Sequence, residues 1–244
     1  MIDRGAGVSP GLGLLRQTAG VLMLGPGPAG VINSRAAQLS LGAPIFGSVG
    51  RGADTASRPP SSPDVWTGGT GNWSVSSNWS AGLPTSSSDV QITNSGSQVT
   101  EDVTSTINTL SLSSGNTWAL NNGLSLTIDG NSISNSGGMT LNSSGNFTIL
   151  ELAANATLSG GGTVTMSNNA QNYIEGAATA DTLTNQETIQ GAGVIGNNRM
   201  TLINSGTINA NQSAGMTINS NGGVTNTGTI EATGGTLLLY GTTV

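Results

Sequence analysis

Residues 202–210 read Leu-Ile-Asn-Ser-Gly-Thr-Ile-Asn-Ala, and related copies stand at 183–191 and 224–232. The copies share the pattern apolar-x-Asn-x-x-Thr-Ile-polar-small, and their asparagines lie 19 and then 22 residues apart. A period near twenty residues is typical of a stacked solenoid, in which each turn buries its apolar side only against its neighbours. The residues that define this repeat are Asn185, Ile189, Asn204, Ile208, Asn226 and Ile230.

Upstream of these copies the chain alternates in polarity from one residue to the next. Leu124, Leu126 and Ile128 alternate with Ser125 and Thr127, and clusters of Asn and Gly bound such stretches. This alternation is typical of short, half-buried strands. One coil of a few short strands cannot bury its apolar side alone, so we expect coils to stack about 4.8 Å apart with parallel strand pairing. The sequence therefore predicts an all-β fold, a parallel β-helix of about seven coils.

Equivalent positions of the repeat should form columns along such a stack. We expect Ile189, Ile208 and Ile230 to fill the core, while the threonine before each of them lines an outer face. The three recurring asparagines have two interpretations. They either stack as a ladder of amide side chains at one corner, or they serve as ordinary turn residues.

The sequence divides into three blocks of different composition. Residues 1–64 are rich in Gly, Ala, Pro and Arg without a period, which predicts a disordered leader or, alternatively, a gene-model artefact. Residues 65–99 hold three of the four tryptophans, and residues 100–244 hold the repeats. The last repeat is followed by a new strand without any cap, so we predict that the array is truncated at its C-terminal side.

Trp66, Trp73 and Trp79 also have two interpretations. Bulky rings at the start of the array can cover the open core of the first coil, which would otherwise invite pairing with another chain. Alternatively, aromatic rings can stack on sugars. Because these three residues stand where the array begins, we favour an N-terminal cap and keep glycan stacking as the alternative.

The charge of the chain limits its partners. Charged residues make up only 7% of the sequence, and Lys, His and Cys are absent. From Val65 onward Arg199 is the only basic residue, so there is no basic patch for nucleic acid or anionic lipid. No apolar run is long enough to span a membrane, and no export signal is evident near the N-terminus.

Two groups of motifs resemble a known family. The pattern Trp66-x-Gly-x-x-Gly-Asn-Trp73, followed by Asn78-Trp79, is similar to the opening of many bacterial surface β-helix proteins. The Asn-Ser-Gly-Thr-Ile and Asn-Thr-Gly-Thr-Ile repeats resemble those of autotransporter passenger domains and haemagglutinin-like adhesins. The resemblance covers residues 65–244. It implies a right-handed β-helix that is secreted or displayed at the bacterial cell surface or outer membrane, often in adhesion.

The residues give little support to catalysis. Without His the usual nucleophilic triads are excluded, and without Cys and His zinc loses its commonest ligands. A phosphate-binding loop would need a Lys. Asp181 and Glu187 are the two carboxylates considered for hydrolysis, and the other acidic residues are scattered. We therefore predict no enzyme activity, no catalytic residue, no metal and no cofactor.

The leading functional hypothesis is a structural or adhesive rod at the cell surface. It would bind a host or environmental surface, glycans or sister molecules, with edge-to-edge self-association as a further option. The alternative is a β-helix that binds or degrades polysaccharide. Ice binding is a third hypothesis, because ice-binding surfaces favour Thr-x-Thr ladders; residues 163–165 and 225–227 fit that motif but do not recur in register.

Overall fold

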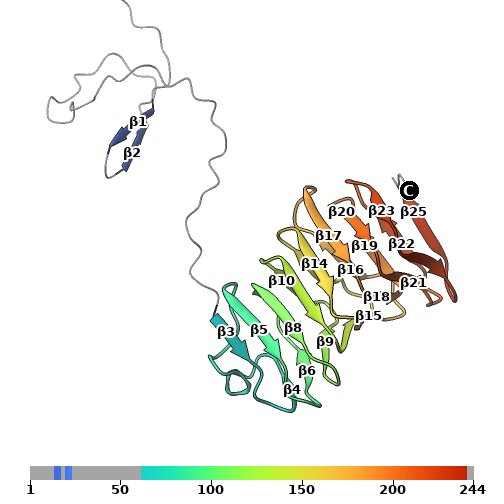
Figure 1. Ribbon diagram of the computed structural model, residues 1–244, viewed down its shortest axis with the longest axis horizontal. Helices are drawn as coiled ribbons and strands as arrows, with labels where there is room; N and C mark the ends of the chain where they lie inside the picture. Colours follow the sequence, from blue (N-terminus) through green and yellow to red (C-terminus); the bar gives the residue numbers. More distant parts are fainter. Residues whose placement is uncertain (1–13, 18–19, 24–61, 241–244) are drawn as a thin grey trace, which may run out of the picture. The chain divides into compact units, whose positions relative to one another are not determined.

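The computed structural model describes residues 14–17, 20–23 and 62–240 (Figure 1). The chain divides into two units, Met1–Asp54 and Thr55–Val244. In the first unit the described residues form one antiparallel pair, β1 (Leu14–Gln17) with β2 (Gly20–Met23). The rest of the predicted leader, up to residue 61, lies outside the described residues.

Residues 62–240 form an all-β parallel β-solenoid of about eight turns, which confirms the predicted fold class. Three parallel sheets of eight, eight and seven strands run along it, and each complete turn contributes one strand to every sheet. Figure 1 shows the strands stacked side by side from β3 to β25. The strands that precede residue 100 already pair in register with later ones, so the solenoid begins earlier than the repeats indicated.

Each sheet is named here by the order in which a turn visits it. Sheet 1 contains β3 (Ser62–Val65), β5 (Ser88–Ile92), β8 (Thr109–Leu112), β11 (Ser132–Asn135), β14 (Ala156–Ser159), β17 (Asp181–Asn185), β20 (Met200–Asn204) and β23 (Val224–Asn226). Sheet 2 contains β4 (Thr70–Asn72), β6 (Gln98–Glu101), β9 (Thr117–Asn121), β12 (Gly138–Asn142), β15 (Thr163–Met166), β18 (Thr188–Gly191), β21 (Thr207–Ala210) and β24 (Thr229–Ala232). Sheet 3 contains β7 (Ser105–Ile107), β10 (Ser125–Ile128), β13 (Thr148–Leu152), β16 (Asn172–Gly176), β19 (Gly193–Gly196), β22 (Met216–Asn219) and β25 (Leu237–Tyr240).

The core is a set of apolar columns that run through successive turns. Ile189 pairs in register with Ile208, and Ile208 with Ile230. Ile189 and Ile208 are fully buried, whereas Ile230 in the last turn is only partly buried. Thr188 and Thr207 pair on the opposite, outward side of the same strands. Full burial of an isoleucine side chain stabilises the fold by roughly 1.5–3 kcal/mol, so the repeated Thr-Ile step is a main source of stability.

The recurring asparagines form a ladder at the corner between sheets 1 and 2. Asn185 Nδ2 donates to Asn204 Oδ1 at 2.7 Å, and Asn204 Nδ2 donates to Asn226 Oδ1 at 2.7 Å. Each amide also donates to the backbone carbonyl two residues ahead, at Glu187 (2.9 Å), Gly206 (3.2 Å) and Gly228 (3.2 Å). One N–H therefore serves the ladder while the other holds the turn, so both interpretations of these asparagines apply together.

The glycine that follows each later asparagine is required by the close approach of the coils. A Cβ atom at Gly206 would lie 2.2 Å from the Glu187 carbonyl oxygen, and one at Gly228 would lie 2.1 Å from the Gly206 carbonyl oxygen. The first copy of the repeat departs from this rule, because Glu187 occupies the glycine position. The glycines at 160–162 lie in the preceding coil, and the Gly162 N–H donates to the Glu187 carboxylate, as described below.

The three N-terminal tryptophans form a buried cluster near the start of the solenoid. Trp66, Trp73 and Trp79 are 0%, 1% and 5% exposed. Trp79 packs edge-on against both of the others, with ring centroids 4.9 Å from Trp66 and 4.6 Å from Trp73. The Trp79 Nε1 donates to the Trp73 carbonyl at 2.8 Å, and the Trp66 Nε1 donates to the Gly69 carbonyl at 3.1 Å. The cluster thus buries both its apolar rings and their polar N–H groups.

Candidate functional site

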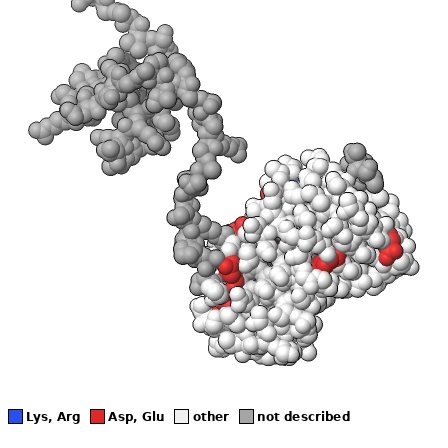
Figure 2. Space-filling view, in the orientation of Figure 1, with Lys and Arg blue, Asp and Glu red and all other residues white. Residues whose placement is uncertain are grey.

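The outer surface of the solenoid is largely uncharged. Figure 2 shows acidic groups standing singly or in small groups on an otherwise uncharged face. Between residues 62 and 240 the only basic side chain is that of Arg199. It lies over the outer face of sheet 3, where charged and aromatic side chains are neighbours, and this makes that face the candidate site.

Two outward-facing columns run along the middle of sheet 3. One contains Ile149, Tyr173 and Val194; the other, two residues further along the strands, contains Thr127, Glu151 and Glu175. Side chains two apart on a strand point to the same side, about 6.6 Å apart, and neighbouring strands lie about 4.8 Å apart. An apolar column and an acidic column are therefore close neighbours on one surface.

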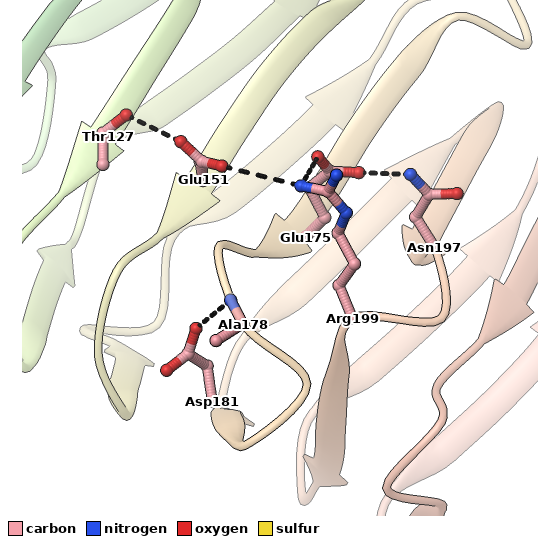
Figure 3. A network of polar contacts seen from close by, with 7 residues as sticks. All are labelled: Thr127, Glu151, Glu175, Ala178, Asp181, Asn197 and Arg199. Atoms are coloured by element: carbon pink, nitrogen blue, oxygen red, sulfur yellow. Dashed lines mark hydrogen bonds and ion pairs between the residues drawn. The ribbon is translucent and has the colours of Figure 1, made fainter.

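The acidic column is connected by a network of polar contacts (Figure 3). Arg199 Nη1 lies 3.4 Å from Glu175 Oε1 and 4.0 Å from Glu151 Oε1. Asn197 Nδ2 donates to Glu175 Oε2 at 2.6 Å, and Thr127 Oγ1 donates to Glu151 Oε2 at 3.0 Å. The Glu175 residue is only 5% exposed, whereas half of the Arg199 side chain is exposed. The network therefore holds a guanidinium group at the surface in a defined position.

The turn between β19 and β20 places two of these side chains. Asn197 and Asn198 have φ values of 46° and 59°, in the left-handed region that asparagine tolerates better than most residues. The turn is held by the Arg199 N–H, which donates to the Gly196 carbonyl at 2.8 Å, and by the Asn198 N–H, which donates to Asn219 at 2.7 Å. This turn brings Asn197 and Arg199 back over Glu175 on β16 (Figure 3).

An aromatic pair lies beside the acidic network. Phe147, just before β13, packs edge-on against Tyr173 of β16 with ring centroids 5.3 Å apart. Phe147 is 58% exposed, the highest value among the large hydrophobic residues that the structure describes as exposed. Its exposure leaves most of the phenyl ring available for contact with another molecule.

The tryptophans that the sequence singled out lie elsewhere. Trp66, Trp73 and Trp79 pack against one another in the buried cluster, where at most 5% of any of them is exposed. A sugar could stack on these rings only if the cluster opened. The exposed aromatic pair, Phe147 and Tyr173, was missed by sequence reasoning. One signal was available: Ile149-x-Glu151 and Tyr173-x-Glu175 repeat an apolar-x-Glu spacing 24 residues apart.

The two carboxylates considered for hydrolysis have separate partners. Asp181 accepts from the Ala178 N–H at 2.7 Å and closes its own turn (Figure 3). Glu187 accepts from Asn135 Nδ2 at 3.0 Å and from the Gly162 N–H at 3.1 Å, across the space left by the glycine run. Burial raises the pKa of Glu187 to about 7, although both hydrogen bonds oppose the shift.

A second buried carboxyl group belongs to Glu101 of β6. It is 0% exposed, accepts from Trp118 Nε1 at 2.9 Å and is also bonded to the Ser105 hydroxyl. Burial raises its pKa to about 8. Ser105 also lines a shallow surface hollow of about 510 Å³, together with Trp73, Leu83, Pro84, Thr85, Ser86, Val103, Thr104 and Thr106. The Ser105 hydroxyl is already bonded to Glu101, and the rest of the lining mixes apolar side chains with Ser and Thr.

Sheet 2 carries the outward threonine column that the repeat predicted, extended by one coil to Thr163. Thr163, Thr188, Thr207 and Thr229 pair in register on its outer face. The neighbouring column reads Thr165, Gln190, Asn209 and Glu231, so Thr-x-Thr occurs in only one of these four coils. The second Thr-x-Thr motif, at 225–227, begins in sheet 1. The ladder of paired threonines expected for ice binding is therefore incomplete.

Among the described residues, no group of three or more Asp, Glu, His or Cys side chains is arranged to hold a metal ion. In that same part of the chain, no helix is long and apolar enough to cross a membrane. Comparisons with protein-family models, curated proteins and solved structures found no match to this chain. The structure therefore defines the class of protein as a parallel β-solenoid, and its function is argued from the surface.

Proposed function

We propose that this protein is a structural or adhesive rod of an autotransporter-like adhesin, secreted or displayed at a bacterial cell surface, without catalytic activity. Its partners would be a host or environmental surface, glycans or sister molecules, and edge-to-edge association would join copies of the rod. The observation that supports the proposal is that the buried residues hold successive coils together. Asn185, Asn204 and the isoleucine columns all serve the stacking of coils, which is the requirement of a stiff spacer.

The surface supports the same proposal. It has few charges, and its only cation between residues 62 and 240 is already bonded to Glu175. Such a surface does not attract nucleic acid. It can still present flat, hydroxyl-rich strand faces to another surface, because the outer columns of sheets 1 and 2 consist mainly of Ser, Thr and Gln.

The test is to label intact, unpermeabilised cells with an antibody against the chain. The proposal expects labelling of intact cells and loss of adhesion to an abiotic or host surface when the gene is deleted. Labelling that appears only after the cells are permeabilised would contradict surface display. Surface labelling with unchanged adhesion would leave a structural rod and remove the adhesive role.

The second candidate is a β-solenoid that binds or degrades polysaccharide. The specific observation in its favour is the exposed Phe147–Tyr173 pair beside Glu151 and Glu175. Degradation has weaker support than binding, because both carboxylates lie side by side on one face and contact Arg199, whereas hydrolysis needs carboxyl groups on either side of the bond. Incubation with a glycan panel separates the two outcomes by cleavage against retention.

A further inference from the structure

The aromatic rings of the described residues are divided unequally between the core and the surface. All four tryptophans are buried, whereas Phe147 is 58% exposed and Tyr173 is half-buried on the outer face of sheet 3. Their edge-on contact leaves one face of the phenyl ring toward solvent. Aromatic rings are rigid and lose little conformational entropy when a ligand packs on them, so this pair is a ready contact surface.

The second step is the row of polar groups next to these rings. Glu151 and Glu175 lie two residues beyond Ile149 and Tyr173, about 6.6 Å along the strands, and Asn197 and Arg199 contact Glu175. Phe147 lies two residues before Ile149, on the other side of that column. Together they present carboxylate acceptors, amide and guanidinium donors, and all are already fixed by mutual bonds (Figure 3). A ligand with an apolar face and hydroxyl groups on its rim matches this arrangement, and a pyranose ring has both.

The charge of this surface limits the kind of ligand that it can bind. The polar row carries two carboxylates and one guanidinium group, and the solenoid around it is acidic. A uronic acid polymer or a sulfated glycan would be repelled, because like charges on facing surfaces oppose association. A neutral polysaccharide meets no such barrier.

We propose that the outer face of sheet 3 over β13, β16 and β19 is a binding site for a neutral polysaccharide chain. The exposed ring of Phe147 stacks on the apolar face of a sugar ring, and Tyr173, which meets Phe147 edge-on, adds contact from the side. Arg199, Asn197 and the exposed edge of Glu151 bind its hydroxyl groups. The inference rests on the proposed adhesive function, for which it names the ligand class and the surface that contacts it.

The test uses the full chain and isothermal titration calorimetry with four neutral hexasaccharides: cellohexaose, xylohexaose, laminarihexaose and mannohexaose. Polygalacturonate serves as the charged comparison. We expect saturable binding of at least one neutral probe, no binding of polygalacturonate, and an affinity lowered at least about fivefold by Phe147→Ala. Arg199→Gln should also weaken binding, because it removes donors without removing the aromatic surface.

Two controls separate the site from general surface effects. Tyr240→Ala removes another exposed aromatic ring, 53% exposed, from the same sheet, and Glu231→Gln removes an exposed carboxylate from sheet 2. Neither should change the affinity. Circular dichroism melting of every variant checks that Phe147→Ala folds, as its exposure leads us to expect.

Three results would overturn the inference: no neutral probe binds, polygalacturonate binds best, or Phe147→Ala and Tyr240→Ala have the same effect. These failures are distinguishable from failure of the proposed function. Cells that are labelled at their surface and adhere, while the purified chain binds none of the probes, would reject the glycan site and retain the adhesive rod. If the purified chain binds a probe but the protein never reaches the cell surface, the glycan site is retained and the surface-displayed adhesive rod is rejected.

Discussion

The first and last turns of the solenoid protect their core to different extents. At the start, Trp66, Trp73 and Trp79 are at most 5% exposed. At the end, Leu239 is 45% exposed, although Ile218, its partner in register one turn earlier, is fully buried. Both positions belong to the same apolar column, so residue type alone does not explain the difference. Burial in this fold depends on whether a neighbouring coil or a cluster of bulky rings covers the position.

This comparison implies that stability is distributed unevenly along the stack. A substitution should be most costly where a side chain is covered on both sides and least costly in the last described turn. The predictions that follow test this gradient, in order of the expected size of the effect.

The largest effect is expected in the tryptophan cluster. Trp73→Ala should lower the free energy of unfolding by about 3–5 kcal/mol, because it leaves a cavity and separates Trp79 from its partner. Urea unfolding followed by far-ultraviolet circular dichroism measures the change. The matched variant Tyr240→Ala, an aromatic residue in the last turn, should cost less than about 1 kcal/mol. Equal losses would show that the cluster does not protect the first turn.

The next largest loss of stability is expected for substitutions of two isoleucines in one column. Ile208→Ala should cost about 2–5 kcal/mol, whereas Ile230→Ala should cost less than half as much, since Ile230 is only partly buried. Native-state hydrogen exchange of the β18 and β21 amides reports the local loss in each variant. A larger loss from Ile230→Ala would contradict the gradient.

A smaller loss of stability is expected for substitutions in the asparagine ladder. Asn204→Ala removes the acceptor of Asn185 and the donor to Asn226, both at buried or half-buried sites, and should cost about 1–3 kcal/mol. Asn226→Ala removes only one rung and should cost less. Asn142→Ala, at an exposed position of β12, is the control and should leave Tm unchanged within error.

The smallest effect is expected in the pH dependence. The pKa values of Glu101 and Glu187 are raised by burial to about 8 and about 7, so the folded state holds their protons more tightly than the unfolded state does. Their contribution is full below the ordinary glutamate pKa and is lost as pH rises through these values. Tm should therefore fall as the pH is raised from 5 to 9. The double variant Glu101→Gln, Glu187→Gln should flatten this slope, and an unchanged slope would place the titrating groups elsewhere.

The fold could be predicted from the sequence because each copy of the repeat is contained in one short, continuous segment. Thr-Ile and the asparagine before it recur within a nine-residue segment, so strand, core position and corner are all visible without knowing the register. The same property explains the role of Asn204, whose partners are the equivalent residues of the next copies.

The candidate site could not be predicted in this way, because its residues come from coils of unequal length. Tyr173 follows Ile149 by 24 residues and precedes Val194 by 21, and only the strand register aligns them. An error of one residue in register moves a side chain to the opposite face. Arg199 is placed by a left-handed turn, which depends on two asparagines that also fit an ordinary loop.

Glu187, the exception to the repeat, makes contacts that are specific to its own neighbouring coils. It stands at the position where the later copies require glycine, and its carboxylate accepts from Asn135, two coils earlier, and from Gly162 in the coil between them. A duplicate of the coil that contains Asn204 could be inserted beside itself, because each asparagine donates to the amide oxygen of the next copy. A duplicate of the coil that contains Glu187 could not, since its carboxylate would meet a second carboxylate instead of a glycine gap. The hydrogen bonds of the ladder therefore permit the solenoid to be lengthened by duplicating its later coils but not the coil that contains Glu187.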